Sequence, residues 1–363
     1  MAGEAIGDRR QYSAQMHRRV TISVAAVALA LAACSSGDDA VNSQAAAAAT
    51  SIAAATATTV ASASATDPPA TDSVPTDPPV KDPPPTQPST TDAEAPSTIN
   101  ATAGRPYDVF VPTGYDAATP TPLMLLLHGY GANGDIQEGY FEFEPLAESR
   151  GFLYVHPDGT VDAGGNQFWN ATDACCAFGG DSPDDSAYLM AIIDEVSADY
   201  NVDPSSIFLA GHSNGGFMSY RMACQHADTI AAIASLAGAT FADPADCTPS
   251  EPVSVLQVHG TDDRVISYGG GSFRGGGIHP GARQTADRWA ASNGCAPTPT
   301  INAEALDFDG GIDGTDTDVE VFTECEQGSA IELWTIGGGS HIPDVTREFS
   351  AGVVDFLLAH PKP

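Results

Sequence analysis

The stretch Ile-Phe-Leu-Ala-Gly-His-Ser-Asn-Gly-Gly, residues 207–216, decides the fold of this 363-residue chain. A short apolar run opens it, and a helical pattern follows from residue 217. A G-x-S-x-G pattern in that setting predicts a nucleophile elbow, in which a strand turns sharply into a helix and exposes one side chain at the top of a sheet. Ser213 is therefore the predicted nucleophile.

Strand and helix patterns alternate over the rest of the chain after residue 98. One alternating run and several continuous apolar runs are typical of half-buried and buried strands. Between them lie segments with helical periodicity. The order predicts the α/β class, with a mostly parallel sheet covered by helices on both faces. The expected strands are 107–111, 123–127, 152–155, 207–210, 253–258 and 331–336, and the expected helices are 186–200, 214–226, 282–293 and 345–360.

Four of these strands end in polar or glycine-rich segments. Besides the elbow, the segments are His128 to Gly131, His259 to Asp263 and Gly337 to His341. In such sheets, ligands bind at the carboxyl ends of the strands. The four segments are therefore expected to form one site.

A serine hydroxyl is a weak nucleophile, so it needs a base within hydrogen-bond reach and an acid that orients the base. His341 is the predicted base, because it follows a strand and a glycine run that lets the loop bend back over Ser213. Asp263 is preferred to Asp262 as the acid, and the order Ser213, Asp263, His341 is the order this type of fold uses. The alternative for His341 is a surface histidine near the C-terminus.

Attack on an ester also requires N–H donors for the oxyanion of the tetrahedral intermediate. The amide of Asn214, directly after the nucleophile, is one expected donor. The amide of Tyr130, in the loop after the strand that ends at Leu127, is the other. The alternative for this second loop is a plain glycine turn.

The first hundred residues differ in composition from the rest. Arg18 and Arg19 precede an apolar run that ends in small residues and Cys34. This pattern predicts a lipoprotein-type signal over 1–34, with lipid on Cys34 and a mature protein at the cell envelope or outside the cell. An ordinary secretory signal is the alternative, and Met16 is an alternative start. The composition of residues 35–97 predicts a disordered Ala/Thr/Pro/Asp-rich tether. The alternating strand and helix patterns of residues 98–363 predict one domain.

The net charge of −33 limits the partners of the chain. Only nine lysines and arginines lie in 98–363, too few to assemble a basic patch that neutralises phosphates. Nucleic acid is therefore not an expected partner. The acidity is interpreted as a source of solubility, with recognition of a cationic substrate as the alternative.

Six cysteines besides Cys34 suggest three disulfides in an exported domain. The hypothesis pairs Cys224 with Cys247 and Cys295 with Cys325. The neighbours Cys175 and Cys176 then remain for each other, which is a rare bond. None of the six falls in a C-x-x-C pair, so a zinc site is not expected.

The combined motifs resemble those of the secreted esterase family that includes LpqC-like lipoproteins, polyhydroxybutyrate depolymerases and feruloyl esterases. They are Leu127-His128-Gly129, the segment from Phe168 to Cys176, Asp184-Asp185, the elbow, the 259–263 loop and the 337–341 loop. The resemblance implies an α/β-hydrolase fold, a serine esterase mechanism and no cofactor. His128, Trp169 and Asp185 are assigned to the substrate cleft, although Trp169 is equally compatible with the core.

Two segments depart from simple expectations. Many relatives have the histidine directly after the glycines, whereas here Ser340 intervenes and Ile342-Pro343 follow His341. The acid-rich stretch from Asp307 to Asp318 invites a calcium interpretation, but Ile312 stands where the loop pattern requires glycine. A solvated acidic loop without metal is expected.

The leading hypothesis is a secreted or lipid-anchored monomeric serine carboxylesterase that acts on polyhydroxybutyrate-type esters. The alternative is a feruloyl or acetyl esterase of plant polysaccharides, and the sequence does not separate the two. No polymer-binding module follows in this sequence, which favours soluble oligoesters or small esters over crystalline polymer. A non-catalytic envelope binding protein and a peptidase on the same fold are the hypotheses from other classes.

Overall fold

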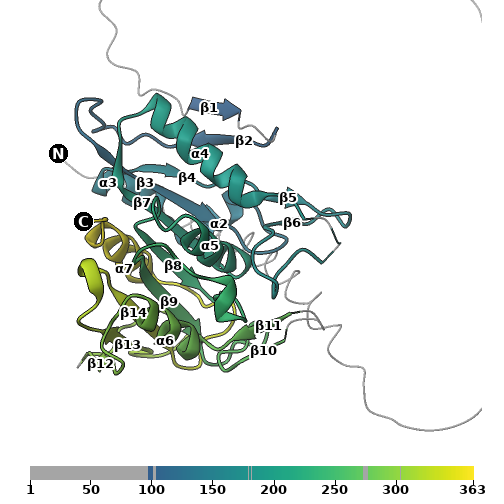
Figure 1. Cartoon of the computed structure of the whole chain (residues 1–363), viewed down its shortest axis with the longest axis vertical. Coiled ribbons are helices and arrows are strands. Elements are labelled where there is room, and N and C mark those ends of the chain that lie inside the picture. The colour runs from purple at the N-terminus through teal and green to yellow at the C-terminus, as the bar shows by residue number, and fades with distance from the viewer. Residues whose placement is uncertain (1–96, 101–103, 179, 181, 273–276, 303) are drawn as a thin grey trace, which may run out of the picture. The chain divides into compact units, whose positions relative to one another are not determined.

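The computed structural model describes residues 97–100, 104–178, 180, 182–272, 277–302 and 304–363 (Figure 1). The expected signal over 1–34, the lipidation residue Cys34 and the tether up to residue 96 lie outside the described residues.

An eight-stranded sheet forms the centre of the domain, in the order β12-β13-β14-β9-β8-β7-β3-β4. The six strands from β14 to β4 run parallel, whereas β12 and β13 are antiparallel at one edge. The predicted mostly parallel α/β sheet is therefore confirmed. The strands are β3 Thr121–Leu127, β4 Leu153–Val155, β7 Val202–His212, β8 Ala232–Leu236, β9 Ser254–Gly260, β12 Thr300–Ile301, β13 Thr317–Phe322 and β14 Ile331–Ile336.

Helices cover both faces of this sheet, because its central strands are apolar on both sides. Leu123, Leu125 and Leu127 of β3 pack into one core with residues of α4, α5 and α6, while Met124 and Leu126 pack into the opposite core with residues of α2, α3 and α7. A continuous apolar run is what such two-sided burial requires. The helices are α2 Gly134–Phe141, α3 Glu144–Arg150, α4 Asp185–Asp199, α5 Asn214–Gln225, α6 Ala282–Ser292 and α7 Arg347–Ala359.

Smaller elements surround the central sheet (Figure 1). Within the described part of the chain there are three two-stranded antiparallel pairs and two short 3₁₀ helices. Among the described helices, none is long and apolar enough to cross a membrane. The pairs are β1 Ser97–Asn100 with β2 Pro106–Val109, β5 Thr160–Val161 with β6 Gln167–Phe168, and β10 Gly270–Ser272 with β11 Ile278–Pro280, and the 3₁₀ helices are η1 Pro244–Asp246 and η2 Glu326–Gly328.

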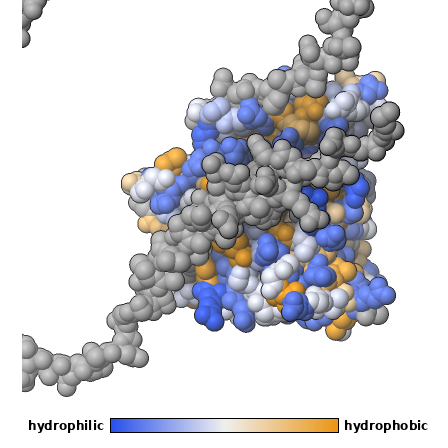
Figure 2. All heavy atoms as spheres, turned by 180° about the vertical axis from the view of Figure 1, so that it is seen from behind, coloured by the Kyte–Doolittle hydropathy of each residue, from blue (hydrophilic) through white to orange (hydrophobic). Residues whose placement is uncertain are grey.

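The surface mixes polar and apolar residues. Hydrophilic residues separate small hydrophobic patches on the described part of the face in Figure 2. Large apolar side chains that are strongly exposed are few among the described residues: Val161, Phe178, Ile278 and Ile301. Single exposed apolar residues are normal on a soluble domain, and they do not by themselves define a binding surface.

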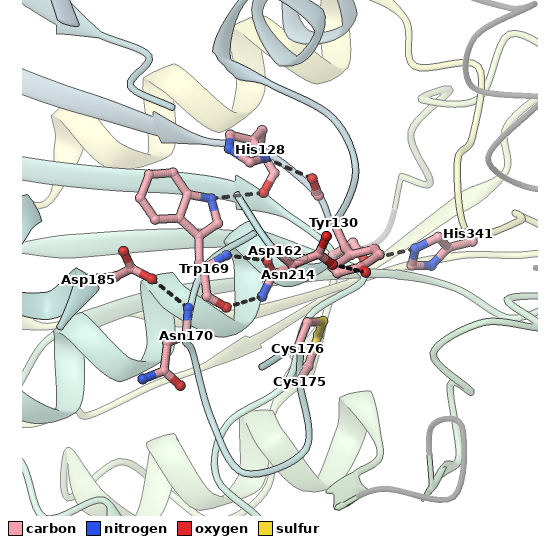
Figure 3. Close-up of a disulfide and its surroundings, with 12 residues drawn as sticks. His128, Tyr130, Asp162, Trp169, Asn170, Cys175, Cys176, Asp185, Asn214 and His341 are labelled. Carbon is pink, nitrogen blue, oxygen red and sulfur yellow. Dashed lines mark hydrogen bonds between the residues drawn. A yellow bond between two sulfur atoms is a disulfide. The ribbon is translucent and has the colours of Figure 1, made fainter. Parts of the chain in front are cut away.

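The three hypothesised disulfides are confirmed. Cys224 at the end of α5 pairs with Cys247 after η1, and Cys295 after α6 pairs with Cys325 before η2. The adjacent Cys175 and Cys176 also form a disulfide, which lies near the predicted site (Figure 3). Three disulfides are typical of proteins from an oxidising compartment.

The acidic stretch from 307 to 318 is not simply a solvated loop, which corrects the expectation from the sequence. Asp309 is buried, and its carboxylate accepts the N–H groups of Gly311 and Asp344. Asp316 accepts the N–H groups of Phe308 and Asp309. Backbone donors thus satisfy these carboxylates, and the stretch supports the segment that follows β14.

Candidate active site

The turn from β7 into α5 has the geometry of a nucleophile elbow. Ser213 lies between the two elements with φ 53° and ψ −117°, a conformation that non-glycine residues seldom adopt. A Cβ at Gly211 would overlap the backbone of Gly215, and a Cβ at Gly215 would overlap the carbonyl oxygen of Leu127. The two glycines are therefore required by close backbone approach, which lets the serine project at the strand end.

Ser213, His341 and Asp263 lie in one hydrogen-bonded chain. The Nε2 atom of His341 is 3.0 Å from the Ser213 Oγ atom, and its Nδ1 atom is 2.8 Å from the Oδ2 atom of Asp263. Asp263 is buried, whereas its neighbour Asp262 is exposed. Of the two aspartates, Asp263 is therefore the one placed to orient the imidazole.

The carboxylate of Asp263 is held in its ionised form. Burial alone would raise its pKa, but hydrogen bonds from His259 and His341 outweigh burial and hold the pKa well below the ordinary value. Its Oδ1 atom accepts the N–H groups of Val265 and Ile266, each at 2.8 Å. A charged acceptor therefore faces His341.

The loop that carries His341 is fixed by contacts from other elements. The Nε2 atom of His212, in the elbow itself, is 2.9 Å from the His341 carbonyl oxygen. Tyr140 of α2 donates its hydroxyl to the carbonyl of Pro343 at 2.7 Å, and the N–H of Asp344 bonds to Asp309 at 3.0 Å. The departure at Ser340-His341-Ile342-Pro343 is therefore accommodated by an anchored loop.

The expected oxyanion donors lie on two segments that meet at Ser213. Asn214 is the first residue of α5, and the first N–H groups of a helix have no acceptor within the helix. A Cβ at Gly129 would lie 3.5 Å from the Cβ of Ser213, so the loop after β3 passes directly beside the nucleophile. Tyr130 follows immediately. The two residues expected to donate therefore lie on segments that meet at the serine.

The side chain of Tyr130 ties this loop to the β5–β6 hairpin. Its hydroxyl donates to Asp162 at 2.6 Å (Figure 3). The same hydroxyl accepts from Asn166 at 3.1 Å. The hydrogen bond from Tyr130 is the main cause that lowers the pKa of Asp162 to about 2. The ring also meets the exposed Phe178 edge-on, with centroids 5.3 Å apart.

The assignment of His128, Trp169 and Asp185 to the substrate cleft is wrong. All three side chains are fully buried, and they bond to neighbouring parts of the protein (Figure 3). The indole N–H of Trp169 donates to the His128 carbonyl, and His128 Nε2 accepts the N–H of Gly159 at 2.8 Å. Asp185 forms an ion pair of 2.8 Å with Arg105. Their polar atoms are used inside the protein rather than offered to a ligand.

Several supporting contacts were not found from the sequence. The Asn214 side chain accepts the Trp169 N–H at 2.7 Å and donates to the Trp169 carbonyl at 2.9 Å, which fixes the 168–170 segment against the start of α5. Gln137 accepts the N–H of Gly129. The guanidinium of Arg105 lies 3.5 Å from the ring centroid of Tyr188. Gln137 and Arg105 carry no motif, and the elbow motif does not show what the Asn214 side chain contacts, so only positions in space reveal these contacts.

A second serine–histidine pair lies in a surface pocket of about 540 Å³. Ser186 Oγ is 2.8 Å from the Nε2 atom of His226. Ser186 belongs to the first turn of α4, where its backbone is helical and forms no elbow. The pocket therefore lacks the strained strand-to-helix turn that distinguishes Ser213. Its lining residues are Asp184, Ser186, Ala187, Met190, Ala191, Asp194, Arg221, Gln225 and His226.

Acid is expected to destabilise the domain through its buried histidines. Burial lowers the pKa of His128 to about 4 and that of His212 to about 3. The unfolded chain, with a pKa near 6.5, binds these protons first, so stability present above about pH 6.5 is lost as the pH falls toward 4. For His128 alone the loss is about 3 kcal/mol. Urea unfolding of the wild type and of His128→Gln at pH 7 and pH 4 measures this difference.

The variant should be less stable at pH 7, but its loss between the two pH values should be smaller. His156→Gln is the control, because its imidazole is partly exposed. Equal losses for the wild type and His128→Gln would contradict the assignment of the acid sensitivity to His128.

A parallel α/β sheet with a serine elbow and a Ser-His-Asp hydrogen-bond chain at its strand ends defines the class of α/β-hydrolases. A solved structure, an acetyl xylan esterase from Aspergillus awamori, agrees with this fold: the TM-score is 0.52 at 14% identity, over 73% of this chain and 99% of that one. The fold prediction is thus confirmed.

Sequence comparison identifies the family. The family model described as "Esterase PHB depolymerase" matches residues 105–265. Feruloyl esterase D of Neurospora crassa is 30% identical over 250 residues, which are 66% of this chain and 74% of that protein. Feruloyl esterase B of Piromyces equi is 30% identical over 237 residues, 63% of this chain but only 41% of that protein. The chain belongs to the polyhydroxybutyrate depolymerase and feruloyl esterase family of carboxylic ester hydrolases, as the resemblance implied.

Proposed function

We propose that this protein is a serine carboxylesterase that works through an acyl-enzyme on Ser213. The observation that carries the proposal is the hydrogen-bonded chain from Ser213 through His341 to Asp263, with distances of 3.0 and 2.8 Å. Such a chain lets an imidazole remove the hydroxyl proton while a carboxylate stabilises the imidazolium that forms.

The reaction follows from these positions. His341 Nε2 takes the Ser213 proton as Oγ attacks the ester carbonyl carbon, and the carbonyl oxygen becomes an oxyanion near the amides of Asn214 and Tyr130. His341 then gives the proton to the leaving alcohol, which departs as the acyl-enzyme forms. Water, deprotonated by the same histidine, attacks the acyl carbon; the bond from that carbon to Oγ then breaks, the acid leaves, and His341 returns the proton to Ser213. Removal of one oxyanion donor typically costs a hundredfold or more in rate.

The proposed substrate class is an ester of a phenolic or acetic acid with a saccharide. Support comes from the names of the relatives, which include feruloyl esterases and a bifunctional acetylxylan esterase/xylanase of Neocallimastix patriciarum. A second candidate is a hydroxybutyrate oligoester, which the description of the matching family supports. Ester cleavage at Ser213 is common to both.

A panel of three substrates separates these candidates. Methyl ferulate, acetylated xylo-oligosaccharide and a 3-hydroxybutyrate trimer are given to the whole chain and to its Ser213→Ala variant. Release of ferulate or acetate that disappears in the variant would support the saccharide esterase, whereas cleavage of the trimer alone would favour the oligoester. No Ser213-dependent release from any of the three would contradict the proposed function.

We further propose that the protein is exported and anchored through a lipid on Cys34. The three disulfides support export, because they persist in oxidising compartments. Expression in a bacterial host with membrane fractionation tests the anchor. The wild type should be found with the membrane and Cys34→Ala should not; equal distribution of the two would contradict the anchor.

A further inference from the structure

Two imidazole nitrogens lie close to the same oxygen of Asp263. His341 Nδ1 lies 2.8 Å from its Oδ2 atom, and His259 Nε2 lies 3.3 Å from that atom. The Oδ1 atom is already occupied by the two backbone N–H groups after Asp263. Three hydrogen-bond donors and the His259 nitrogen therefore surround this carboxylate, and only His341 belongs to the proposed catalytic chain.

A series of buried hydrogen bonds determines which nitrogen of His259 carries the proton. The Tyr220 hydroxyl donates to Gln257 Oε1 at 2.6 Å, and Gln257 Nε2 donates to the Gly238 carbonyl at 3.0 Å. The same Nε2 atom lies 3.1 Å from His259 Nδ1. An amide nitrogen only donates, so Nδ1 must be the acceptor. The proton of neutral His259 is therefore on Nε2, between Asp263 and the Ile266 carbonyl at 2.7 Å.

Titratable groups from several elements face this histidine. Asp263 and, beyond it, His341 lie on the loops after β9 and β14. The ring of Tyr268 meets the His259 ring edge-on, with centroids 5.8 Å apart. His279 of β11 and His212 of the elbow both interact electrostatically with His259. Burial lowers the pKa of His279 and of His212, so both are neutral in the range in which an esterase works.

We propose that Tyr220, Gln257 and His259 form a fixed donor chain that positions Asp263 and limits the negative charge it presents to His341, thereby setting the pH above which His341 acts as a base. This inference rests on the proposed function. Tyr220, Gln257 and His259 are each at most 1% exposed, so water does not compete for these bonds. This donor chain joins α5, which begins directly after the nucleophile, to the loop that carries Asp263.

The direction of the expected pH shift follows because His341 and His259 share Asp263 Oδ2 as an acceptor. Each donor on Oδ2 draws electron density from the oxygen that faces His341. With His259 in place, Asp263 stabilises a protonated His341 less than an aspartate with His341 alone would. Removal of the His259 donor should therefore make His341 hold its proton to a higher pH.

The test is the pH dependence of kcat/KM in whole-chain variants. His259→Phe fills similar space without a donor, and Gln257 keeps the Gly238 carbonyl as its acceptor. The acid limb should move upward by about 0.5 to 1 pH unit. His259→Gln, which can place an N–H near the position of Nε2, should keep the midpoint within about 0.2 pH unit. The proposal would be overturned if His259→Phe and His259→Gln lost activity equally while the midpoint of the acid limb stayed where it is in the wild type.

Tyr220→Phe provides the second variant. It removes only a hydroxyl that does not touch the triad and lets the Gln257 amide turn its oxygen toward His259. An upward shift of the acid limb is again expected, and it should be smaller than that of His259→Phe. If His259→Phe does not fold, an unmoved midpoint in Tyr220→Phe overturns the inference.

A spectroscopic measurement separates this inference from the proposed function. The proton between His341 Nδ1 and Asp263 should give a low-field NMR resonance in the protonated imidazole, and it should move further downfield in His259→Phe. This readout needs no substrate. A shifted resonance in a protein without esterase activity would support the donor chain while contradicting the proposed function, and an unshifted one would overturn the donor chain alone.

Discussion

Replacement of Ser213 by alanine is expected to lower kcat/KM for p-nitrophenyl acetate by about 10⁵-fold, with the fold unchanged. The hydroxyl supplies the oxygen that attacks the ester carbonyl carbon and then carries the acyl group in the proposed mechanism. The amides of Asn214 and Tyr130, which we propose as the oxyanion donors, remain in the variant and would assist direct attack by water. Initial rates with matched protein concentrations measure the loss, and near-UV circular dichroism verifies the fold.

Ser186→Ala is the matched control for this variant. Ser186 also has a histidine nitrogen 2.8 Å from its hydroxyl, but it lies within a regular helix. It should keep activity within about twofold of the wild type. Loss of activity in Ser186→Ala with retention in Ser213→Ala would move the reaction to the other serine and contradict the site proposed here.

Sequence patterns could predict the sheet because burial on both faces leaves continuous apolar runs. β3, β7, β9 and β14 were each expected within a few residues. β8 was not, since its Ala-Ile-Ala-Ser-Leu sequence is short and alanine-rich and so carries little strand signal. β13 was missed because it begins inside the acid-rich stretch. Strands were therefore missed in two settings. In β8 alanines take the place of larger apolar residues, and β13 begins among acidic residues whose carboxylates bind backbone N–H groups.

The candidate site could be predicted only as far as it lies at strand ends. Ser213, Asp263 and His341 each follow an apolar run, and the fold brings those ends together. His128, Trp169 and Asp185 lie in equally distinctive motifs, yet their polar atoms bond within the protein. A motif alone does not show whether a polar side chain faces a ligand or a buried backbone group. Tyr220 and His259 are 39 positions apart, and no local pattern links them.

Replacement of Asp263 by asparagine is expected to lower kcat by about 10³- to 10⁴-fold. The backbone N–H groups of Val265 and Ile266 require an oxygen at the Oδ1 position, so the new amide nitrogen must take the Oδ2 position. There it meets His341 Nδ1 as a donor. His341 would then move its proton to Nε2, and that nitrogen could no longer accept the proton of Ser213.

Asp262→Asn is the matched control for the loss of one negative charge. It removes the same charge one residue away, from an exposed side chain, and should change kcat less than about twofold. Steady-state rates on p-nitrophenyl acetate at pH 8, with thermal unfolding to exclude misfolding, compare the two. A general effect of negative charge near the site would lower both rates alike. Only an acid that sets the tautomer of His341 makes the neighbouring substitutions differ by three orders of magnitude, because tautomer control depends on contact and not on net charge.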